Sequence, residues 1–436
     1  MKRTGENHMK YSKVLTASAA LAVGALALSG CSGSGGESDD GTVTMSLWQN
    51  STTGPGQQFW IDAIAAFEEA NPGVTIEMQS VQNEDMDGKL QTALNAGDPP
   101  DIFLQRGGGK MTAMVNAGQL MDLTGLISDE IRSEIPEGSF AAETYQDKVW
   151  AMPLSVLPGG FFYSQDAFDN AGITGTPETI GDLESAVEAL KATGIAPIAL
   201  GAKDAWPAAH WYYFFALREC SPAVIEATGD SKDFSDECWL RAAEDLADFN
   251  SINPFNEGFL TTPAQQGAGS SAGLIANRQA AMELMGAWDP GVIASLTPDE
   301  QPLPDLAWFP FPEISGGDGE PGSMMGGVDG YSCSAQAPAE CADFLNFVAS
   351  ADQQIAYYEA FQSPPVNTVA QEAVTEPYLQ QILEAYNNAP FVSQWLDTVL
   401  GQNVGSALNV AVVDLLAGGT TPEDFVATIN TAGAQG

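Results

Sequence analysis

The chain has 436 residues, of which 44% are hydrophobic, and its formal net charge is −42 at pH 7. One hydrophobic core rarely serves this much chain, so we expect two lobes. The acidic surface repels phosphate backbones and anionic lipid headgroups, which excludes nucleic acid and a bare membrane surface as partners. The charge suits a neutral ligand but does not identify it.

The first 30 residues have the plan of a secretory signal, with basic residues ahead of an apolar stretch at 14–28. That stretch is shorter than the about 20 residues that a membrane-spanning helix needs. It ends in Leu28-Ser29-Gly30-Cys31, which resembles the lipobox of bacterial lipoproteins. The resemblance implies cleavage before Cys31 and lipid attachment to it. An ordinary secreted protein with a stray cysteine is the alternative.

Residues 31–41 follow as glycine, serine and acidic residues without an apolar side chain after the cysteine. They cannot bury anything, so we expect a flexible tether between the lipid and a folded domain. Loss of residues 1–30 removes four basic and one acidic side chain, which takes the net charge to −45. The protein is then expected on the extracellular face of the membrane, as in Gram-positive lipoproteins, held only by its lipid. Met1 and Met9 both remain candidates for the first residue.

Four further cysteines, Cys220, Cys238, Cys333 and Cys341, allow three disulfide pairings. We expect the local pairs, Cys220 with Cys238 and Cys333 with Cys341, because each closes a short loop. On the chain-entropy model a loop of about 15 residues contributes roughly 3 kcal/mol. Zinc is the competing use of cysteine, but the sequence has no Cys-x-x-Cys motif or paired histidines. We therefore expect neither a metal nor a cofactor.

Strands and helices alternate through the first part of the folded chain. Polar and apolar residues alternate at 42–48 and 74–81, which predicts strands, and Asp101-Ile-Phe-Leu104 predicts a short buried strand. Helical spacing of apolar residues predicts helices at 57–70 and 86–96, with Asn71-Pro72-Gly73 ending the first. This alternation is typical of a mostly parallel α/β sheet.

Several short motifs occur in a fixed order over nearly the whole chain after the tether. They are Trp48 and the segments 67–74 (FEEANPGV), 96–102 (AGDPPDI), 145–153 (YQDKVWAMP), 161–168 (FFYSQDAF), 176–179 (TPET), 281–288 (AMELMGAW), 326–327 (GG) and 417–424 (AGGTTPED). Each is weak alone. In this order the sequence resembles the extracellular solute-binding proteins, family 1 type, of bacterial ABC sugar and oligosaccharide importers.

The resemblance implies a two-lobed periplasmic-binding-protein-like α/β fold of type II, with several chain crossings at the hinge and extra C-terminal helices. Lobe 1 would hold residues 42–152 plus 290–335, and lobe 2 would hold 153–287 plus 340–436. It further implies a monomer that binds a neutral oligosaccharide in the cleft between the lobes and delivers it to the permease subunits of an ABC importer. Lobe closure, without a covalent step or a catalytic residue, would be the mechanism.

A buried sugar needs aromatic rings for its C–H faces and polar groups for its hydroxyls. The densest aromatic cluster is 206–215, where Trp206 and His210 would lie one helical turn apart on the same face. We assign these two to the ligand and 213–215 to the core of the second lobe. A lone histidine is more often structural than a metal ligand, and no spacing here argues for metal.

The other ligand-binding candidates follow from their positions. Trp288 and Asp289 follow an apolar strand, at the position where relatives present an aromatic ring to ligand. Gly327 would let backbone approach closely, and Asp329 would accept a hydroxyl. Open α/β sheets bind ligands beyond the carboxyl ends of their strands. That rule adds the four residues Trp48, Asn50, Gln105 and Arg106, which lie in loops after strands. Trp395 and Asp397, near the C-terminus, are weaker candidates.

A secreted glycoside hydrolase acting on oligosaccharides is the alternative function. Such an enzyme also needs aromatic platforms, together with two facing carboxylates. With 57 acidic residues some pair would always look suitable, so the acids do not exclude it. The order of motifs and the lipid tether favour a binding protein over an enzyme.

Overall fold

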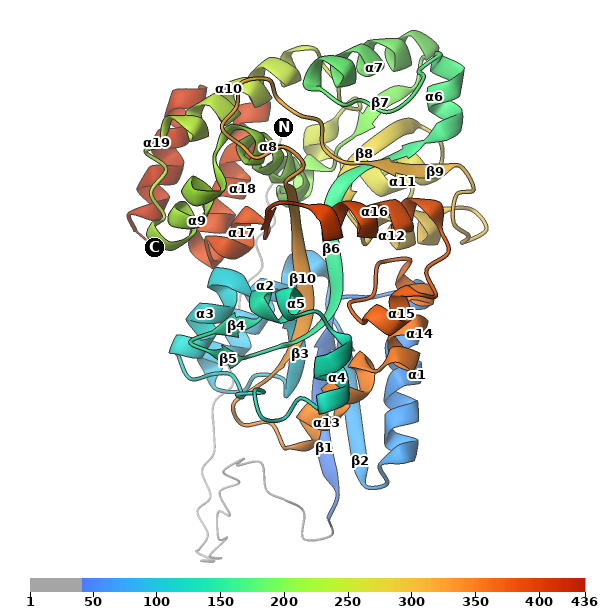
Figure 1. Cartoon of the computed structure of the whole chain (residues 1–436), viewed down its shortest axis with the longest axis vertical. Helices are drawn as coiled ribbons and strands as arrows, with labels where there is room; N and C mark the ends of the chain where they lie inside the picture. The colour runs from blue at the N-terminus through green and yellow to red at the C-terminus, as the bar shows by residue number, and fades with distance from the viewer. Residues whose placement is uncertain (1–40, 436) are drawn as a thin grey trace, which may run out of the picture. The chain divides into compact units, whose positions relative to one another are not determined.

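The structure is a computed structural model that describes residues 41–435. The expected signal peptide, lipid-bearing Cys31 and tether residues 31–40 lie outside this part. None of the helices between residues 41 and 435 is long and apolar enough to cross a membrane. Figure 1 shows the arrangement of the elements.

The first lobe is built on three parallel strands, β1 (Val43–Gln49), β2 (Val74–Ser80) and β3 (Ile102–Gln105), with β1 between the other two. Alternate residues of β1 are buried, as its polar and apolar alternation predicts. The expected helices are α1 (Gly54–Ala70), ended by the Asn71-Pro72-Gly73 turn, and α2 (Asn83–Ala96), ended by left-handed Gly97. The expected strands and helices are thus present, each within a few residues.

Smaller elements complete this lobe. They are α3 (Gly108–Asn116), α4 (Asp129–Glu134), α5 (Glu137–Ala142), β4 (Thr144–Tyr145), β5 (Lys148–Val149), α13 (Glu340–Ala349), α14 (Ala351–Phe361) and α15 (Thr368–Gln371). Phe59 and Phe67 of α1 contact Tyr357 of α14 and Phe344 of α13, at ring-centroid distances of 5.5 and 5.2 Å. These contacts join residues nearly 300 positions apart in one core.

Two long strands connect the lobes (Figure 1). They are β6 (Met152–Ser164), which is buried along its whole length, and β10 (Met324–Cys333), and they pair antiparallel. β10 also pairs with β3 in the first lobe, whereas β6 continues into the second lobe, where it pairs with β8 (Ala280–Gly286) and β9 (Leu306–Phe309). The sheet order is β2-β1-β3-β10-β6-β8-β7, where β7 is Ala196–Ala199.

The second lobe surrounds helix α8 (Trp206–Glu219), whose residues are almost all buried. Its other elements are α6 (Gln165–Ala171), α7 (Ile180–Thr193), η1 (Ala202–Asp204), α9 (Pro222–Ser231), α10 (Glu237–Ser251), η2 (Phe259–Thr261), α11 (Ser271–Ala276), α12 (Asp289–Leu296), α16 (Pro377–Asn388), β11 (Val392–Ser393), α17 (Leu396–Val399), α18 (Gln402–Leu416) and α19 (Pro422–Gly433). Tyr213, Phe214 and Phe215 lie in its core, as expected.

The structure therefore has the two-lobed α/β fold that the sequence predicts, with C-terminal helices packed on the second lobe. The contacts suggest boundaries that differ from the expected ones. Residues 340–361 pack in the core of the first lobe, and residues 290–309 pack in the cores of the second. We therefore propose that residues 340–361 belong to the first lobe and residues 290–309 to the second, because residues that share a hydrophobic core form one lobe.

Both local disulfides are present, which confirms the expected pairing. Cys220, which follows α8, bonds to Cys238 of α10, and Cys333 at the end of β10 bonds to Cys341 of α13. The first bond lies in the second lobe and the second bond in the first lobe. Each disulfide thus ties neighbouring elements within one lobe and leaves the connection between lobes to β6, β10 and the segment between α15 and α16.

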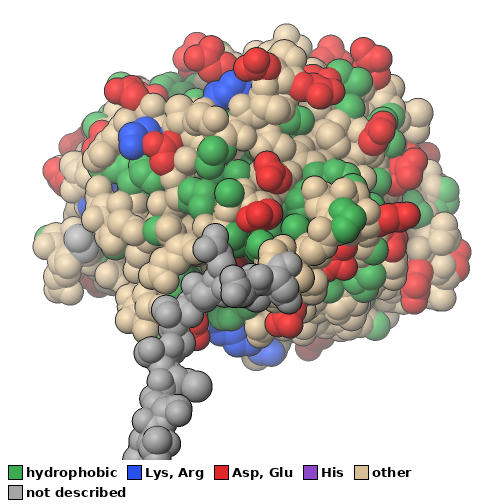
Figure 2. Space-filling model, turned by 90° about the horizontal axis from the view of Figure 1, so that it is seen from below, with side chains coloured by type: hydrophobic (Ala, Val, Ile, Leu, Met, Phe, Trp, Pro, Cys, Tyr) green, Lys and Arg blue, Asp and Glu red, His purple; other side chains and the backbone are tan. Residues whose placement is uncertain are grey.

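Figure 2 shows one face of the molecule, on which acidic side chains are scattered and basic ones are few. The acids do not gather into a single patch on this face, so their repulsion is spread over it. This distribution agrees with a formal charge of −42 in a folded chain of ordinary hydrophobic content.

Candidate functional site

Four ring side chains meet on the side of the second lobe that faces the first lobe. They are Trp206 and His210 of α8, Trp288 between β8 and α12, and Trp395 just before α17, and we call them the aromatic cluster. Trp206 lies 5.2 Å from His210 between ring centroids, as their one-turn spacing predicts, and 6.1 Å from Trp288. His210 stacks on Trp395 at 4.2 Å with an interplanar angle of 15°.

Glycines make room for two of these indoles. A Cβ atom on Gly286 would collide with the six-membered ring of Trp288. Trp395 lies over both connecting strands, where Cβ atoms would be 2.7 Å from it at Gly159 of β6 and 3.1 Å at Gly327 of β10. The close approach expected at Gly327 is therefore an approach of an indole ring to the backbone.

The aromatic cluster contains buried polar atoms without partners. Trp206 Nε1 and His210 Nδ1 are buried and form no hydrogen bond with the described residues. Burial lowers the pKa of His210 to about 4, although the nearby Asp397 carboxylate opposes this effect. The imidazole is thus neutral near pH 7. Buried polar groups without partners are costly, so these two atoms mark places where a ligand could supply hydrogen bonds.

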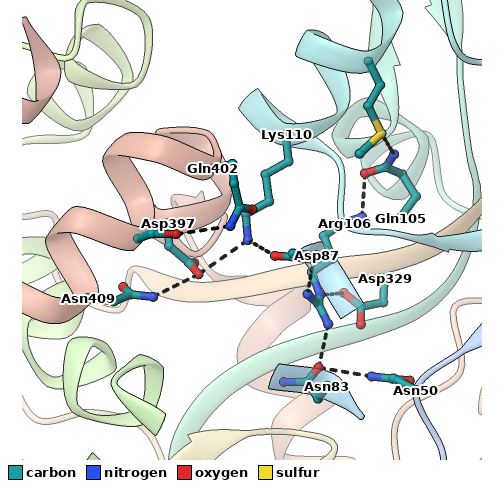
Figure 3. Close-up of polar contacts among 12 residues, drawn as sticks. Asn50, Asn83, Asp87, Gln105, Arg106, Lys110, Asp329, Asp397, Gln402 and Asn409 are labelled. Atoms are coloured by element: carbon teal, nitrogen blue, oxygen red, sulfur yellow. Dashed lines mark hydrogen bonds and ion pairs between the residues drawn. The ribbon is translucent and has the colours of Figure 1, made fainter. Parts of the chain in front are cut away.

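The first lobe places a polar group opposite, made of Asn50, Asn83, Asp87, Arg106 and Lys110 (Figure 3). Arg106 Nη2 donates a hydrogen bond of 2.7 Å to Asn83 Oδ1, and Arg106 Nη1 donates to Asp87 Oδ1 at 3.2 Å. Lys110 Nζ lies 2.8 Å from Asp87 Oδ2, and Asn50 Nδ2 donates to Asn83 at 3.3 Å. Helix α2 supplies Asn83 and Asp87, the loop after β3 supplies Arg106, and α3 supplies Lys110.

The cations of this group oppose the effect of burial on the pKa values of nearby carboxylates. Burial raises the pKa of Asp87, but Arg106 and Lys110 lower it by more, so the net shift is downward. On β10, burial raises the pKa of Asp329 and Arg106 only partly offsets this effect, since Arg106 Nε is 4.0 Å from Asp329 Oδ1. Asn50 and Asp329 also border a cavity of about 30 Å³, together with the buried Ser155 of β6.

One ion pair joins the polar group to the second lobe. Lys110 Nζ lies 3.7 Å from Asp397 Oδ2, and Asn409 Nδ2 of α18 donates to the same oxygen at 3.4 Å (Figure 3). Asp397 is two residues after Trp395 of the aromatic cluster. The polar group of one lobe and the aromatic rings of the other therefore form one site, which we call the inter-lobe site.

The inter-lobe site brings together nine of the twelve residues that the sequence predicts. They are Asn50, Arg106, Trp206, His210, Trp288, Gly327, Asp329, Trp395 and Asp397. The other three lie elsewhere. Trp48 packs on core residues of the first lobe, Gln105 is 2% exposed and contacts Met114, and Asp289 is fully buried near Glu283.

Sequence reasoning missed four residues of the site: Asn83, Asp87, Lys110 and Asn409. Lys110 had a visible signal, because three glycines precede it in a chain with only 15 basic residues. Those glycines place α3 against α17, where a Cβ on Gly109 would be 2.5 Å from the Val399 carbonyl oxygen. Asn83 and Asp87 have no comparable signal. Among residues 41–435, no group of three or more His, Cys, Asp or Glu side chains is placed to hold a metal ion.

Two lobes joined by paired strands, with polar and aromatic side chains facing each other between them, define a two-lobed binding protein. Residues 50–355 match the family described as bacterial extracellular solute-binding protein, which is well over half of the chain. The chain therefore belongs to the bacterial extracellular solute-binding protein family.

Curated relatives are about a quarter identical to this chain. A putative binding protein of Brucella abortus is 26% identical over 44% of this chain and 46% of its own length. The chain thus spans less than half the length of the first curated relatives it matches. The alignment is longer with an uncharacterized ABC transporter extracellular-binding protein of Pyrococcus horikoshii, at 26% identity over 77% of this chain and 79% of the relative.

Solved structures agree with the fold. A protein from a study of xylan utilization by Caldanaerobius polysaccharolyticus superposes with a TM-score of 0.82 at 25% identity, covering 89% of this chain and 99% of that one. A chitin oligosaccharide binding protein gives a TM-score of 0.81 at 24% identity, covering 90% and 98%. The second likeness, at this identity, shows the fold alone.

Proposed function

We propose that this protein binds a neutral oligosaccharide in the inter-lobe site and delivers it to the permease subunits of an ABC importer. The observation that carries the proposal is the aromatic cluster, in which two buried nitrogen atoms have no hydrogen-bond partner among residues 41–435, facing the polar group on the other lobe. Sugar rings pack their C–H faces on indoles, and their hydroxyls need directional polar partners. Trp206 Nε1 can donate to a hydroxyl, and Asp329 and Asp397 can accept from one.

The names of relatives support a carbohydrate ligand. A melibiose/raffinose/stachyose-binding protein of Bacillus subtilis is 26% identical over 42% of this chain and 40% of the relative. A diacetylchitobiose binding protein of Streptomyces coelicolor is 26% identical over 42% and 43%. These ligands differ in linkage and in sugar type, so the names support the class of ligand and not one sugar.

The mechanism follows from which contacts depend on the position of the lobes. The Lys110–Asp397 pair and the aromatic–polar arrangement exist only when the lobes are close. A ligand that contacts both lobes favours that state by its differential affinity, and a permease can then distinguish closed from open forms. The protein acts as a monomer, outside the cell and held to the membrane by lipid on Cys31. It breaks no bond in its ligand.

Calorimetric titration with neutral oligosaccharides tests the proposal. Trp206→Phe removes the indole N–H and part of the ring, so it should weaken binding about tenfold or more while the fold survives. Trp308→Phe is the matched control, because Trp308 Nε1 is likewise a buried atom without a partner among the described residues, but Trp308 packs on Gly160 outside the aromatic cluster. Equal losses in the two variants would argue that Trp206 only fills the core.

Thin-layer chromatography of the titrated samples separates binding from hydrolysis. A binding protein returns every oligosaccharide intact, whereas a glycoside hydrolase produces shorter sugars. Release of products would overturn the proposal in favour of the enzyme. Failure to bind any saccharide would overturn both interpretations of the inter-lobe site.

A further inference from the structure

A second set of contacts crosses between the lobes at the Trp206 end of the aromatic cluster. Gln266, in the segment between η2 and α11 of the second lobe, donates through Nε2 to Gln82 Oε1 at 2.7 Å and to Glu84 Oε2 at 3.4 Å. Gln82 and Glu84 lie at the start of α2 in the first lobe. These side chains therefore bridge the lobes without using the aromatic rings.

The position of Glu84 fixes this bridge next to Trp206. Burial raises the pKa of Glu84, and the Asp204 carboxylate, just before α8, adds to this rise. The Trp206 indole opposes this rise, so the Glu84 carboxylate lies beside that ring. Asp204 in turn accepts a hydrogen bond of 2.7 Å from the Ala264 N–H, which holds the segment that carries Gln266 against the start of α8.

The opposite end of the aromatic cluster is closed by different residues. There Lys110 reaches Asp397 beside Trp395, and the backbone of Gly108 and Gly109 packs on α17. A Cβ on Gly108 would be 3.0 Å from the Thr398 carbonyl oxygen, so no space for a ligand exists between these backbones. Between the two ends, α2 supplies Asn83 and Asp87 to the polar group.

The aromatic cluster between these ends is short. The His210 ring lies between those of Trp206 and Trp395, at centroid distances of 5.2 and 4.2 Å. The Trp288 ring also contacts both, at 6.1 Å from Trp206 and 5.8 Å from Trp395. A long glycan that crosses this cluster along the line from Trp206 to Trp395 would have to pass one of the two bridged ends. Doing so would break the Gln266 bridge or the Lys110–Asp397 pair.

We infer that the inter-lobe site selects short saccharides whose two ends are both enclosed, and that Gln82, Glu84 and Gln266 set the length limit at the Trp206 end. The inference rests on the proposed carbohydrate-binding function and adds to it a class of ligand, namely di- and trisaccharides rather than internal segments of polysaccharides. The Gln266 bridge is the more adjustable end, because the Gln266 side chain is exposed and meets the first lobe through side-chain hydrogen bonds.

Titration with one homologous series, from disaccharide to hexasaccharide of the same linkage, tests this inference. We expect tight binding of the di- or trisaccharide and at least tenfold weaker binding of the hexasaccharide. Gln266→Ala and, separately, Gln82→Ala should improve hexasaccharide binding several-fold and change disaccharide binding little. Gln58→Ala is the matched control, because Gln58 is an exposed glutamine whose side chain bonds to Asp62 on the surface of α1.

The outcomes separate the inference from the proposed function. Equal affinity for all lengths in the wild-type protein would overturn the length limit and leave carbohydrate binding intact. Unchanged discrimination in both bridge variants would overturn the role of the Gln266 bridge. Absence of binding to every member of several such series would overturn the inference together with the proposed function.

Discussion

Lys110 of α3 lies between two carboxylates, 2.8 Å from Asp87 Oδ2 in its own lobe and 3.7 Å from Asp397 Oδ2 in the other. The lysine side chain is 11% exposed and that of Asp397 is 20% exposed, so water screens this interaction only partly. If the lobes separate, Asp397 loses its ion pair while Asp87 keeps both Lys110 and Arg106. The Lys110–Asp397 contact therefore favours the closed arrangement.

Replacement of Lys110 by Met should shift the protein toward the open form and weaken ligand binding about tenfold, which corresponds to about 1.4 kcal/mol. The expected change is mainly a faster dissociation, because the pair forms on closure. Calorimetry gives the affinity, and small-angle scattering gives the increase in radius of gyration. Lys89→Met is the control, since Lys89 pairs with Asp85 on the exposed surface of α2 and crosses no interface. Unchanged affinity in Lys110→Met would contradict this role.

Gly286→Ala should displace the Trp288 ring from the aromatic cluster, because the added methyl group would occupy the space of the six-membered ring. We expect a tenfold or greater loss of oligosaccharide affinity, with a loss of stability of about 1–3 kcal/mol from overpacking. Calorimetry and urea unfolding measure the two effects. Gly88→Ala in α2 is the control, because a Cβ atom added there would have no neighbour within 4 Å and alanine favours helix. Full affinity in Gly286→Ala would remove Trp288 from the site.

The sequence predicts those parts of the site that depend on local pattern. Trp206 and His210 are one helical turn apart, so helix geometry alone brings their rings together. The two disulfides are predictable for a similar reason, because the paired cysteines are close in the sequence. Parallel strands at 43–49 and 74–80 follow from alternation and from the helix between them.

The rest of the site depends on contacts between distant segments. Lys110 and Asp397 are almost 290 residues apart, and Gln82 and Gln266 are 184 apart. No periodicity links such residues, because their approach is decided by how β6 and β10 join the lobes. Trp48 and Gln105 end strands as the rule for α/β sheets requires, yet their side chains turn into the core of the first lobe. Strand position predicts the edge of the sheet, and not the direction of each side chain.

Removal of the Cys220–Cys238 disulfide, as the double variant Cys220→Ser and Cys238→Ser, should lower stability by roughly 3 kcal/mol on the chain-entropy model. The two cysteines are 18 residues apart and join the end of α8 to α10. Ligand affinity should change little, because Trp206 and His210 lie at the other end of α8. Urea unfolding and calorimetry check these statements. A large loss of affinity with little loss of stability would mean that the disulfide positions the aromatic cluster.

Glu283 of β8 and Asp289 of α12 form a buried acidic pair whose four carboxylate oxygens have no hydrogen-bond partner among the described residues. Burial raises the pKa of Asp289 from 3.8 to about 8. Burial also raises the pKa of Glu283, and repulsion from Asp289 adds to this rise, while the nearby Ser271 hydroxyl opposes it. The folded protein therefore holds protons that the unfolded chain releases, so stability should fall as pH rises from about 4 toward 8.

Asp289→Asn should reduce this loss, because an amide at that position does not ionise. We expect the free energy of unfolding of the variant, relative to wild type, to increase between pH 5 and pH 8 by more than about 1 kcal/mol, since each pKa unit is worth about 1.4 kcal/mol. Urea unfolding over this pH range measures the difference. Asp62→Asn, at an exposed position of α1, is the control and should leave the pH dependence unchanged. A difference between Asp289→Asn and wild type that is constant with pH would show that Asp289 is ionised in the folded chain as it is in the unfolded chain.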